Sequence, residues 1–416
     1  MKKEPSLIEN ISLMWFVNFF KLATPIILIP WLTRILDSET FGFYMYSVAF
    51  AAWLSILIDY GFGFSGTRTI AKNKDNNKFV SKYLNAIISA KILISSFLIF
   101  ICILFYFISP IFRNNISWLF ISFFVAILIS LVPLYYFQGK ETLRKLGIIE
   151  ATINILNVIL VLSYVKGEED IPILFLLMIL PRFFIVIISY IVIFYEIDFR
   201  PKLDFRYGLE ILYEGFYFAL FQITNGIYTS FNVIFLAFFV SPTLVGVYAT
   251  CERIIRVFIT FIGQAAHIVF PRIISLSSLD MSKMKTLRNK SLYGFLFLGI
   301  ISAFALYLFS SFLSEIFLPN QKTEFIAVLR YMLFALIPIS ISTVYYSQYF
   351  LLNNDEKILS FIIIFCLIFN FIFGYFMIMN FGVKGMAITW PIVEMLVLAL
   401  CILIIHGFLG KRSNFL

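Results

Sequence analysis

Charged residues are scarce in this sequence. Asp, Glu, Lys and Arg make up 13% of its 416 residues, against about 25% in an average soluble domain, while hydrophobic residues make up 61%. A soluble globular chain is excluded because too few charged side chains remain to cover its surface. The composition instead predicts a polytopic membrane protein.

Cysteine and histidine are scarce as well. The four cysteines all lie in apolar runs and indicate neither a disulfide framework nor a metal cluster, and two histidines are too few for a histidine-rich metal site. The sequence contains no P-loop, H-E-x-x-H or G-x-S-x-G segment. We therefore expect no catalytic residues, no metal and no cofactor, and we predict that the protein is not an enzyme.

One nucleotide-binding pattern is present but lacks its context. Gly61–Gly66 fits G-x-G-x-x-G, which binds dinucleotides only after a strand in a βαβ unit. Here the pattern follows a long apolar stretch and leads into a basic segment. We interpret it as a helix end with close packing.

Long apolar stretches dominate the rest of the chain. Twelve of them are long enough to cross a hydrocarbon core of about 30 Å. Their approximate limits are 10–33, 41–63, 82–108, 116–138, 147–165, 171–195, 209–239, 247–274, 291–317, 325–352, 358–379 and 385–408. The connecting segments are short, the longest lying at 64–81, 196–208 and 275–290, so we expect no soluble domain.

An internal repeat divides these stretches. Gly42-Phe43-Tyr44 and Gly246-Val247-Tyr248 open the second and eighth stretches at an offset of 204, and Tyr135–Gln138 and Tyr345–Gln348 match at an offset of 210. A unit of six spans preserves chain direction. The repeat predicts an all-α fold of twelve transmembrane helices in two six-helix bundles, residues 1–200 and 201–416, related by a pseudo-twofold axis along the membrane normal.

The stretch at 247–274 carries a polar stripe on one helical face. On a helix its polar positions fall within about one third of the circumference and span roughly 22 Å: Glu252, Arg253, Arg256, Thr260, Gly263, Gln264 and His267. Charges at membrane depth usually face a bundle interior or a water-filled path. Two interpretations stay open, a polar interior pathway and a structural Glu252–Arg256 ion pair at i,i+4.

Basic residues outnumber acidic ones inside the predicted spans. We expect Lys91 to lie near a span end, where its side chain reaches the membrane surface. Folds built from two such halves place a substrate between them, so we expect the first, second, seventh and eighth stretches to line a cavity. Basic side chains nearer the midplane, together with polar ones on the faces toward this cavity, suit an anionic substrate, because Arg binds phosphate through its forked donors. The predicted site for such an anionic substrate comprises Lys21, Arg253, Arg256, Asn225, Asn232 and Gln264.

Energy for transport is expected from an ion gradient, because no ATP-hydrolysis motif is present. Asp59 and Glu252 are the acidic residues on predicted cavity faces, and an acid at membrane depth can carry a proton. The alternative is that Glu252 pairs with Arg256 and stays ionised. Full dependence of transport on the proton gradient in both Asp59→Asn and Glu252→Gln variants would exclude them as coupling groups.

Several short motifs are informative through their order and spacing along the chain: Leu32–Tyr44, Asp59–Gly61 followed by Arg68, Tyr136–Gly139, Val245–Ala249 and Phe270–Arg272. Together they resemble the polysaccharide-biosynthesis or O-antigen flippase family of the multidrug, oligosaccharidyl-lipid and polysaccharide exporter superfamily. The resemblance implies alternating access in a bacterial cytoplasmic membrane. It implies transfer of undecaprenyl-diphosphate-linked oligosaccharide to the outer leaflet for O-antigen or other surface polysaccharide, with a polymerase and a chain-length regulator as partners.

Two other functions stay open. An ion-coupled multidrug exporter of the same superfamily would need a net acidic cavity for cationic drugs, whereas this cavity counts as basic. A non-transporting membrane scaffold for glycan assembly would have no need for polar stripes on several helices.

The distribution of Lys and Arg predicts the orientation. With the N-terminus inside, 21 of the 32 fall in inside segments, 5 in outside segments and 6 within spans, so both termini are predicted to be cytoplasmic. The net charge of +9 is then a topology signal and does not indicate nucleic-acid binding. Reporters fused after Lys74 and Lys285 should read cytoplasmic, and one in the Glu168–Asp170 loop external. An external signal at Lys74 would overturn the orientation.

Overall fold

The chain is helical throughout the part that the structure describes. This structure is a computed structural model describing residues 24–351 and 356–405, and within those ranges it contains no strand. Nine helices there are long and apolar enough to cross a membrane, and they coincide with nine of the predicted stretches. The prediction of an all-α polytopic membrane protein is confirmed, whereas the exact count of twelve spans is not.

The three remaining stretches differ from the nine. Only part of the first is described, as the shorter helix Thr24–Ile35. The seventh and eighth correspond to α10 (Phe205–Ser230) and α12 (Pro242–Leu279), which are 26 and 38 residues long. A span needs about 20 residues, so both are long enough. Both carry charged residues, with Glu252, Arg253 and Arg256 close together in α12.

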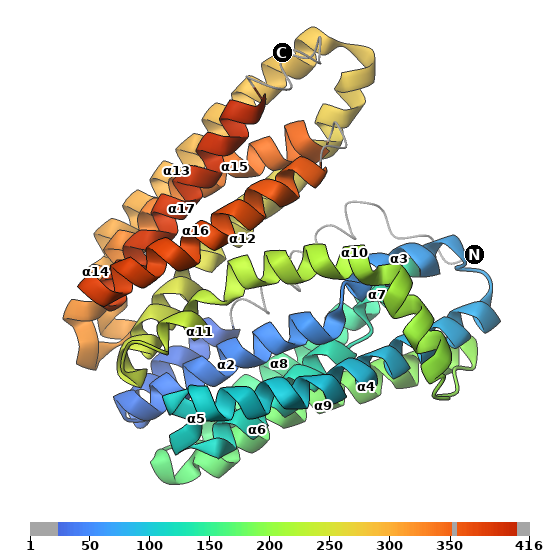
Figure 1. The fold of residues 1–416 in the computed structure, drawn as a ribbon, viewed down its shortest axis with the longest axis horizontal. Helices are drawn as coiled ribbons and strands as arrows, with labels where there is room; N and C mark the ends of the chain where they lie inside the picture. The colour runs from blue at the N-terminus through green and yellow to red at the C-terminus, as the bar shows by residue number, and fades with distance from the viewer. Residues whose placement is uncertain (1–23, 352–355, 406–416) are drawn as a thin grey trace. The chain divides into compact units, whose positions relative to one another are not determined.

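The chain forms two compact units that divide between Phe238 and Phe239. In the first unit α2 packs against α6 and α10, and the start of α10 packs against α4 (Figure 1). Its elements after Thr24–Ile35 are α2 (Ser38–Asp59), α3 (Phe62–Lys72), α4 (Asn77–Ile108), α5 (Pro110–Asn114), α6 (Ile116–Leu131), α7 (Leu134–Gly139), α8 (Leu143–Tyr164), a 3-10 turn (Glu168–Asp170), α9 (Ile171–Ile197), α10, and α11 (Asn232–Leu236).

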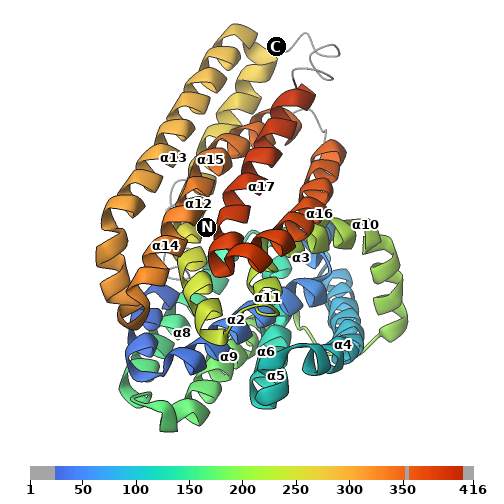
Figure 2. The ribbon, with the colours of Figure 1, turned by 60° about the vertical axis from the view of Figure 1, so that its left-hand side comes forward.

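In the second unit α13 packs against α12 and α15, and α16 packs against α17 (Figure 2). Its elements are α12, α13 (Met281–Phe317), a 3-10 turn (Pro319–Gln321), α14 (Lys322–Met332), a 3-10 turn (Leu333–Ala335), α15 (Leu336–Tyr345), a π-helix (Tyr346–Leu351), α16 (Glu356–Phe381) and α17 (Val383–Ile404).

Short polar side chains begin several helices. The Asp37 carboxylate accepts from the Thr40 N–H at 2.8 Å and caps α2, and Asp204 caps α10 in the same way. At Asp280, which caps α13, the hydrogen bond from the Lys283 N–H lowers the pKa of the carboxyl. These caps fix where helices start along the chain, and so which residues reach membrane depth.

The Gly61–Gly66 segment is a helix end, as predicted. Tyr60 and Gly61 adopt left-handed backbone conformations, with φ of 51° and 81°, and separate α2 from α3. A Cβ at Gly66 would lie 3.2 Å from the Cβ of Tyr135, so α3 packs closely on α7 here. The connecting segment predicted at 64–81 therefore begins inside helix α3.

The repeat seen in the sequence has local counterparts in the structure. Helices α2 and α12 begin at Ser38 and Pro242, which preserves the offset of 204. Tyr135–Gln138 lies in the short helix α7, and Tyr345–Gln348 spans the change from α15 to the π-helix. Both copies thus mark an interruption of a long helix. The boundary at 200/201 and the twofold axis stay predictions.

A close backbone approach in the second unit gives a stability prediction. A Cβ at Gly385 would overlap the Met377 carbonyl, whereas a Cβ at Gly294 would meet nothing within 4 Å. Gly385→Ala should therefore destabilise the protein by about 1–3 kcal/mol. Gly294→Ala, the control, should be neutral or stabilise α13 by about 0.5–1 kcal/mol. Thermal unfolding in detergent measures both, and equal melting temperatures would contradict the packing.

Candidate functional site

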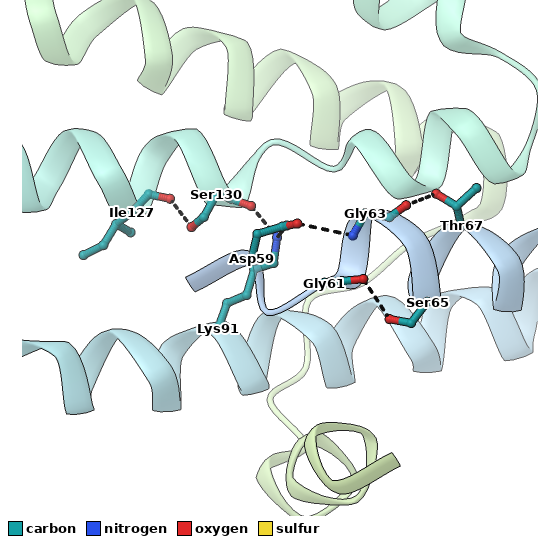
Figure 3. Close-up of polar contacts among 8 residues, drawn as sticks. All are labelled: Asp59, Gly61, Gly63, Ser65, Thr67, Lys91, Ile127 and Ser130. Carbon is teal, nitrogen blue, oxygen red and sulfur yellow. Dashed lines mark hydrogen bonds and ion pairs between the residues drawn. The ribbon is translucent and has the colours of Figure 1, made fainter. Parts of the chain in front are cut away.

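A buried ammonium lies in the first unit where α2, α4 and α6 meet. Lys91 is 1% exposed, and its Nζ donates to Asp59 Oδ1 at 3.0 Å and to the carbonyl oxygen of Ser130 (Figure 3). The prediction that Lys91 reaches the membrane surface is wrong. The residue lies 14 positions after the first residue of α4, roughly 21 Å along the helix axis, and a partner is available there.

Two helix interruptions supply the partners of Lys91. Helix α6 ends at Leu131, and the Leu134 N–H donates to the Val132 carbonyl, so the Ser130 carbonyl is left to accept from the ammonium. On the other side, Asp59 is the last residue of α2, and its carboxylate also accepts from the Gly63 N–H at 3.3 Å. The breaks in two helices therefore meet around one charge.

Aromatic rings complete the surroundings of the ammonium. Lys91 Nζ lies 5.0 Å from the centroid of Tyr135 and 5.9 Å from that of Phe62. Ring faces attract cations, and this attraction increases when water is excluded. Asp59 is more accessible than its partner, because 29% of its side chain is exposed. The first unit thus buries a cation and leaves the acid in contact with its surroundings.

The second unit has the opposite arrangement. The Glu252 carboxylate accepts from Arg256 Nε at 2.8 Å and from Arg256 Nη2. Only 8% of the Glu252 side chain is exposed, against 35% for Arg256. Here the acid is buried and the cation is the accessible partner.

The Arg256 side chain also joins α12 to α17. Its guanidinium carbon lies 5.7 Å from the centroid of Trp390, whose indole N–H donates to Glu394 Oε1 at 3.2 Å. Glu394 is 7% exposed. Trp390 could not be predicted from the sequence because it is 134 positions away from Arg256. The only nearby signal was Glu394, an acid within an apolar stretch four residues after Trp390 on α17.

The remaining predicted site residues are only partly described. Arg253 and Gln264 are half-buried on α12, and Asn232 is buried at the start of α11. Asn225 lies on α10, with a side chain outside the description, and Lys21 lies outside the described residues. The structure brings Glu252 and Arg256 together, as the ion-pair interpretation required. A single site that also includes Lys21 stays a prediction, as does ion coupling through Asp59 or Glu252.

Sequence comparison finds relatives along nearly the whole chain. The family described as "Polysaccharide biosynthesis protein" matches residues 7–277. A protein named "Putative O-antigen transporter" from Escherichia coli (strain K12) is 25% identical over 407 residues, covering 97% of both chains. A protein of the same name from Shigella dysenteriae is 27% identical over 399 residues, covering 94% of this chain and 97% of the relative.

Solved transporter structures share the fold. The lipid II flippase MurJ in an inward closed conformation superposes with a TM-score of 0.71 at 14% identity, covering 98% of this chain and 88% of its own. An inward-facing multidrug resistance MATE family transporter of the MOP superfamily gives 0.69 at 15% identity, covering 96% and 94%. At such low identity these similarities show a common fold.

The ion pair in the first unit predicts an asymmetric mutational effect. Asp59→Asn removes the carboxylate and leaves the Lys91 ammonium buried without its counter-charge, which should cost about 3–5 kcal/mol of unfolding free energy. The double variant Asp59→Asn with Lys91→Met should recover most of that loss. Denaturant unfolding in detergent measures both.

The exposed pair Asp198–Arg200, whose atoms are 3.8 Å apart, provides a control. Asp198→Asn should change the stability by less than about 1 kcal/mol, because water screens exposed pairs. A double variant as unstable as Asp59→Asn alone would show that the charge of Lys91 is not what makes Asp59 necessary.

Proposed function

The chain belongs to the polysaccharide biosynthesis protein family, and we propose that it is a flippase for lipid-linked oligosaccharide. In the proposed reaction, undecaprenyl-diphosphate-linked repeat units pass from the cytoplasmic to the outer leaflet of the bacterial cytoplasmic membrane by alternating access. The observation that carries this proposal is the similarity, over 97% of the chain, to the Escherichia coli protein named "Putative O-antigen transporter". The product would serve assembly of O-antigen or another surface polysaccharide.

The charge arrangement of the second unit supports an anionic substrate. A diphosphate that leaves water needs charge-assisted hydrogen bonds to replace its hydration. Arg256 is the accessible partner of its ion pair, and Arg253 lies three residues away on the same helix, which makes them neighbours on one face. We propose that these two guanidinium groups, together with Lys21, hold the diphosphate while the polyprenyl tail stays in lipid.

Export of cationic drugs is the second candidate, because the MATE transporters share the fold. Fold similarity does not separate the two functions, since the lipid II flippase shares it equally. Within the second unit the exposure of the charged groups favours an anion, because Glu252 is only 8% exposed whereas Arg256 is 35% exposed. The second unit therefore suits an anion better than a cation. The predicted polymerase and chain-length regulator, the orientation and the coupling ion stay proposals.

Arg256 variants test the anion site. Each charge-assisted hydrogen bond contributes about 1.5–3 kcal/mol, so losing one weakens binding roughly tenfold or more. Arg256→Ala should abolish or strongly reduce export of surface glycan in a deletion strain complemented with the variant. Arg256→Lys should keep part of the export, because the positive charge remains but the paired N–H donors of the guanidinium group are lost.

A double variant separates this site from a merely structural ion pair. Glu252→Gln with Arg256→Gln leaves no unpaired charge, so a structural role predicts full export, whereas the anion site predicts none. Arg272→Ala changes an exposed arginine later in α12 and should leave export unchanged. Membrane insertion is checked by immunoblot for every variant, and an active double variant would refute the anion site.

A further inference from the structure

A basic pocket opens in the first unit where α4 begins and α9 ends. It has a volume of about 670 Å³ and is lined by the first three turns of α4 and by the linker from α9 to α10. Four of its lining residues are cationic, Lys78, Lys82, Arg200 and Lys202, against two acids, Asp198 and Asp204. The proposed flippase site uses none of them.

Two buried side chains of α4 fix the linker that forms one wall. Asn85 Nδ2 donates to the Arg200 carbonyl at 3.1 Å, and Asn85 Oδ1 accepts from the Lys202 N–H at 2.9 Å. Ser89 Oγ accepts from the Asp204 N–H at 2.9 Å. Asn85 is 8% exposed and Ser89 is fully buried. The backbone that carries Arg200 and Lys202 is thus set in place before any ligand arrives.

The two acids of the pocket are already engaged. Asp198 lies 3.8 Å from Arg200 in an exposed ion pair, and the Asp204 carboxylate accepts from the Tyr207 N–H at 3.0 Å as the cap of α10. Lys78 and Lys202 have no acidic partner among the described residues. The pocket therefore presents uncompensated positive charge, to which the start of α4 adds the positive end of its helix dipole.

The pocket also adjoins an apolar surface. Leu203, which is 54% exposed, lines it between the charged residues of the linker. Directly afterwards α10 carries large exposed apolar or aromatic side chains at steps of three or four residues: Phe205, Leu209, Tyr213, Phe216 and Leu220. This spacing forms one stripe along the helix. Cationic groups followed by such a stripe match an amphiphile with an anionic head and an acyl chain.

We propose that this pocket binds the phosphate of an anionic phospholipid headgroup at the cytoplasmic membrane surface. Lys78, Lys82 and Lys202 contact the phosphate, and the acyl chain lies against Leu203 and the stripe of α10. Basic pockets between transmembrane helices on the cytoplasmic side are suited to such headgroups. Because the linker joins α9 to α10, the bound lipid would hold this connection against α4. The inference does not depend on the transported substrate.

Binding is measured on the full-length protein in detergent, without any transport assay. Isothermal titration compares short-chain phosphatidylglycerol, phosphatidylcholine and inorganic phosphate. Phosphatidylglycerol should bind at least tenfold more tightly than either of the others. Equal affinity for inorganic phosphate would show a free-phosphate site, and equal affinity for phosphatidylcholine would show that charge is not recognised. Either result overturns the proposal.

Variants locate the site. Lys78→Gln with Lys82→Gln should weaken phosphatidylglycerol binding about tenfold or more, since each basic group near anionic lipid contributes appreciably. Lys72→Gln with Lys290→Gln removes the same charge from exposed positions outside the pocket and should change the affinity less than twofold. Lys202→Gln, a single change on the exposed linker, provides a second variant if the first unfolds. An equal loss of phosphatidylglycerol affinity in the Lys72→Gln with Lys290→Gln variant would refute the proposed binding site.

Discussion

The interaction on which the first unit depends is the burial of the Lys91 ammonium. An unpaired charge in an apolar interior costs several kcal/mol, so the surrounding helices must supply partners. The partners come from the ends of two helices. Helix α2 ends at Asp59, and α6 ends one residue after Ser130, whose carbonyl then accepts a hydrogen bond from Lys91. The α2–α3 and α6–α7 interruptions, which look separate in the sequence, are thus explained by one charge and its 3.0 Å contact with Asp59.

The second unit satisfies the same constraint with the roles of the charges reversed. Its buried group is the acid Glu252, and its accessible group is Arg256, which also lies against Trp390. One unit therefore exposes an acid and the other a cation. This difference supports the proposed anion site, because an anionic headgroup needs an accessible cation.

Local features were predictable from the sequence, and contacts between distant helices were not. Apolar stretches, the helix end at Gly61 and the i,i+4 pair of Glu252 and Arg256 depend on residues close in the chain, and the structure contains all three. The Lys91–Asp59 pair joins residues 32 positions apart. This pair forms only because the ends of α2 and α6 lie beside the middle of α4. The pattern of apolar residues predicts each helix but not which parts of two helices lie side by side. For the same reason the contact between Arg256 on α12 and Trp390 on α17 was not predictable from the sequence.

Reconstituted vesicles test most directly whether accessible cations recognise the charged headgroup. The same oligosaccharide is supplied on a polyprenyl diphosphate and on an uncharged polyprenyl anchor, and a membrane-impermeant glycosidase reports its appearance on the opposite leaflet. The account predicts that the protein accelerates transfer of the diphosphate-linked glycan at least tenfold more than transfer of the neutral one. Equal acceleration of both would contradict it.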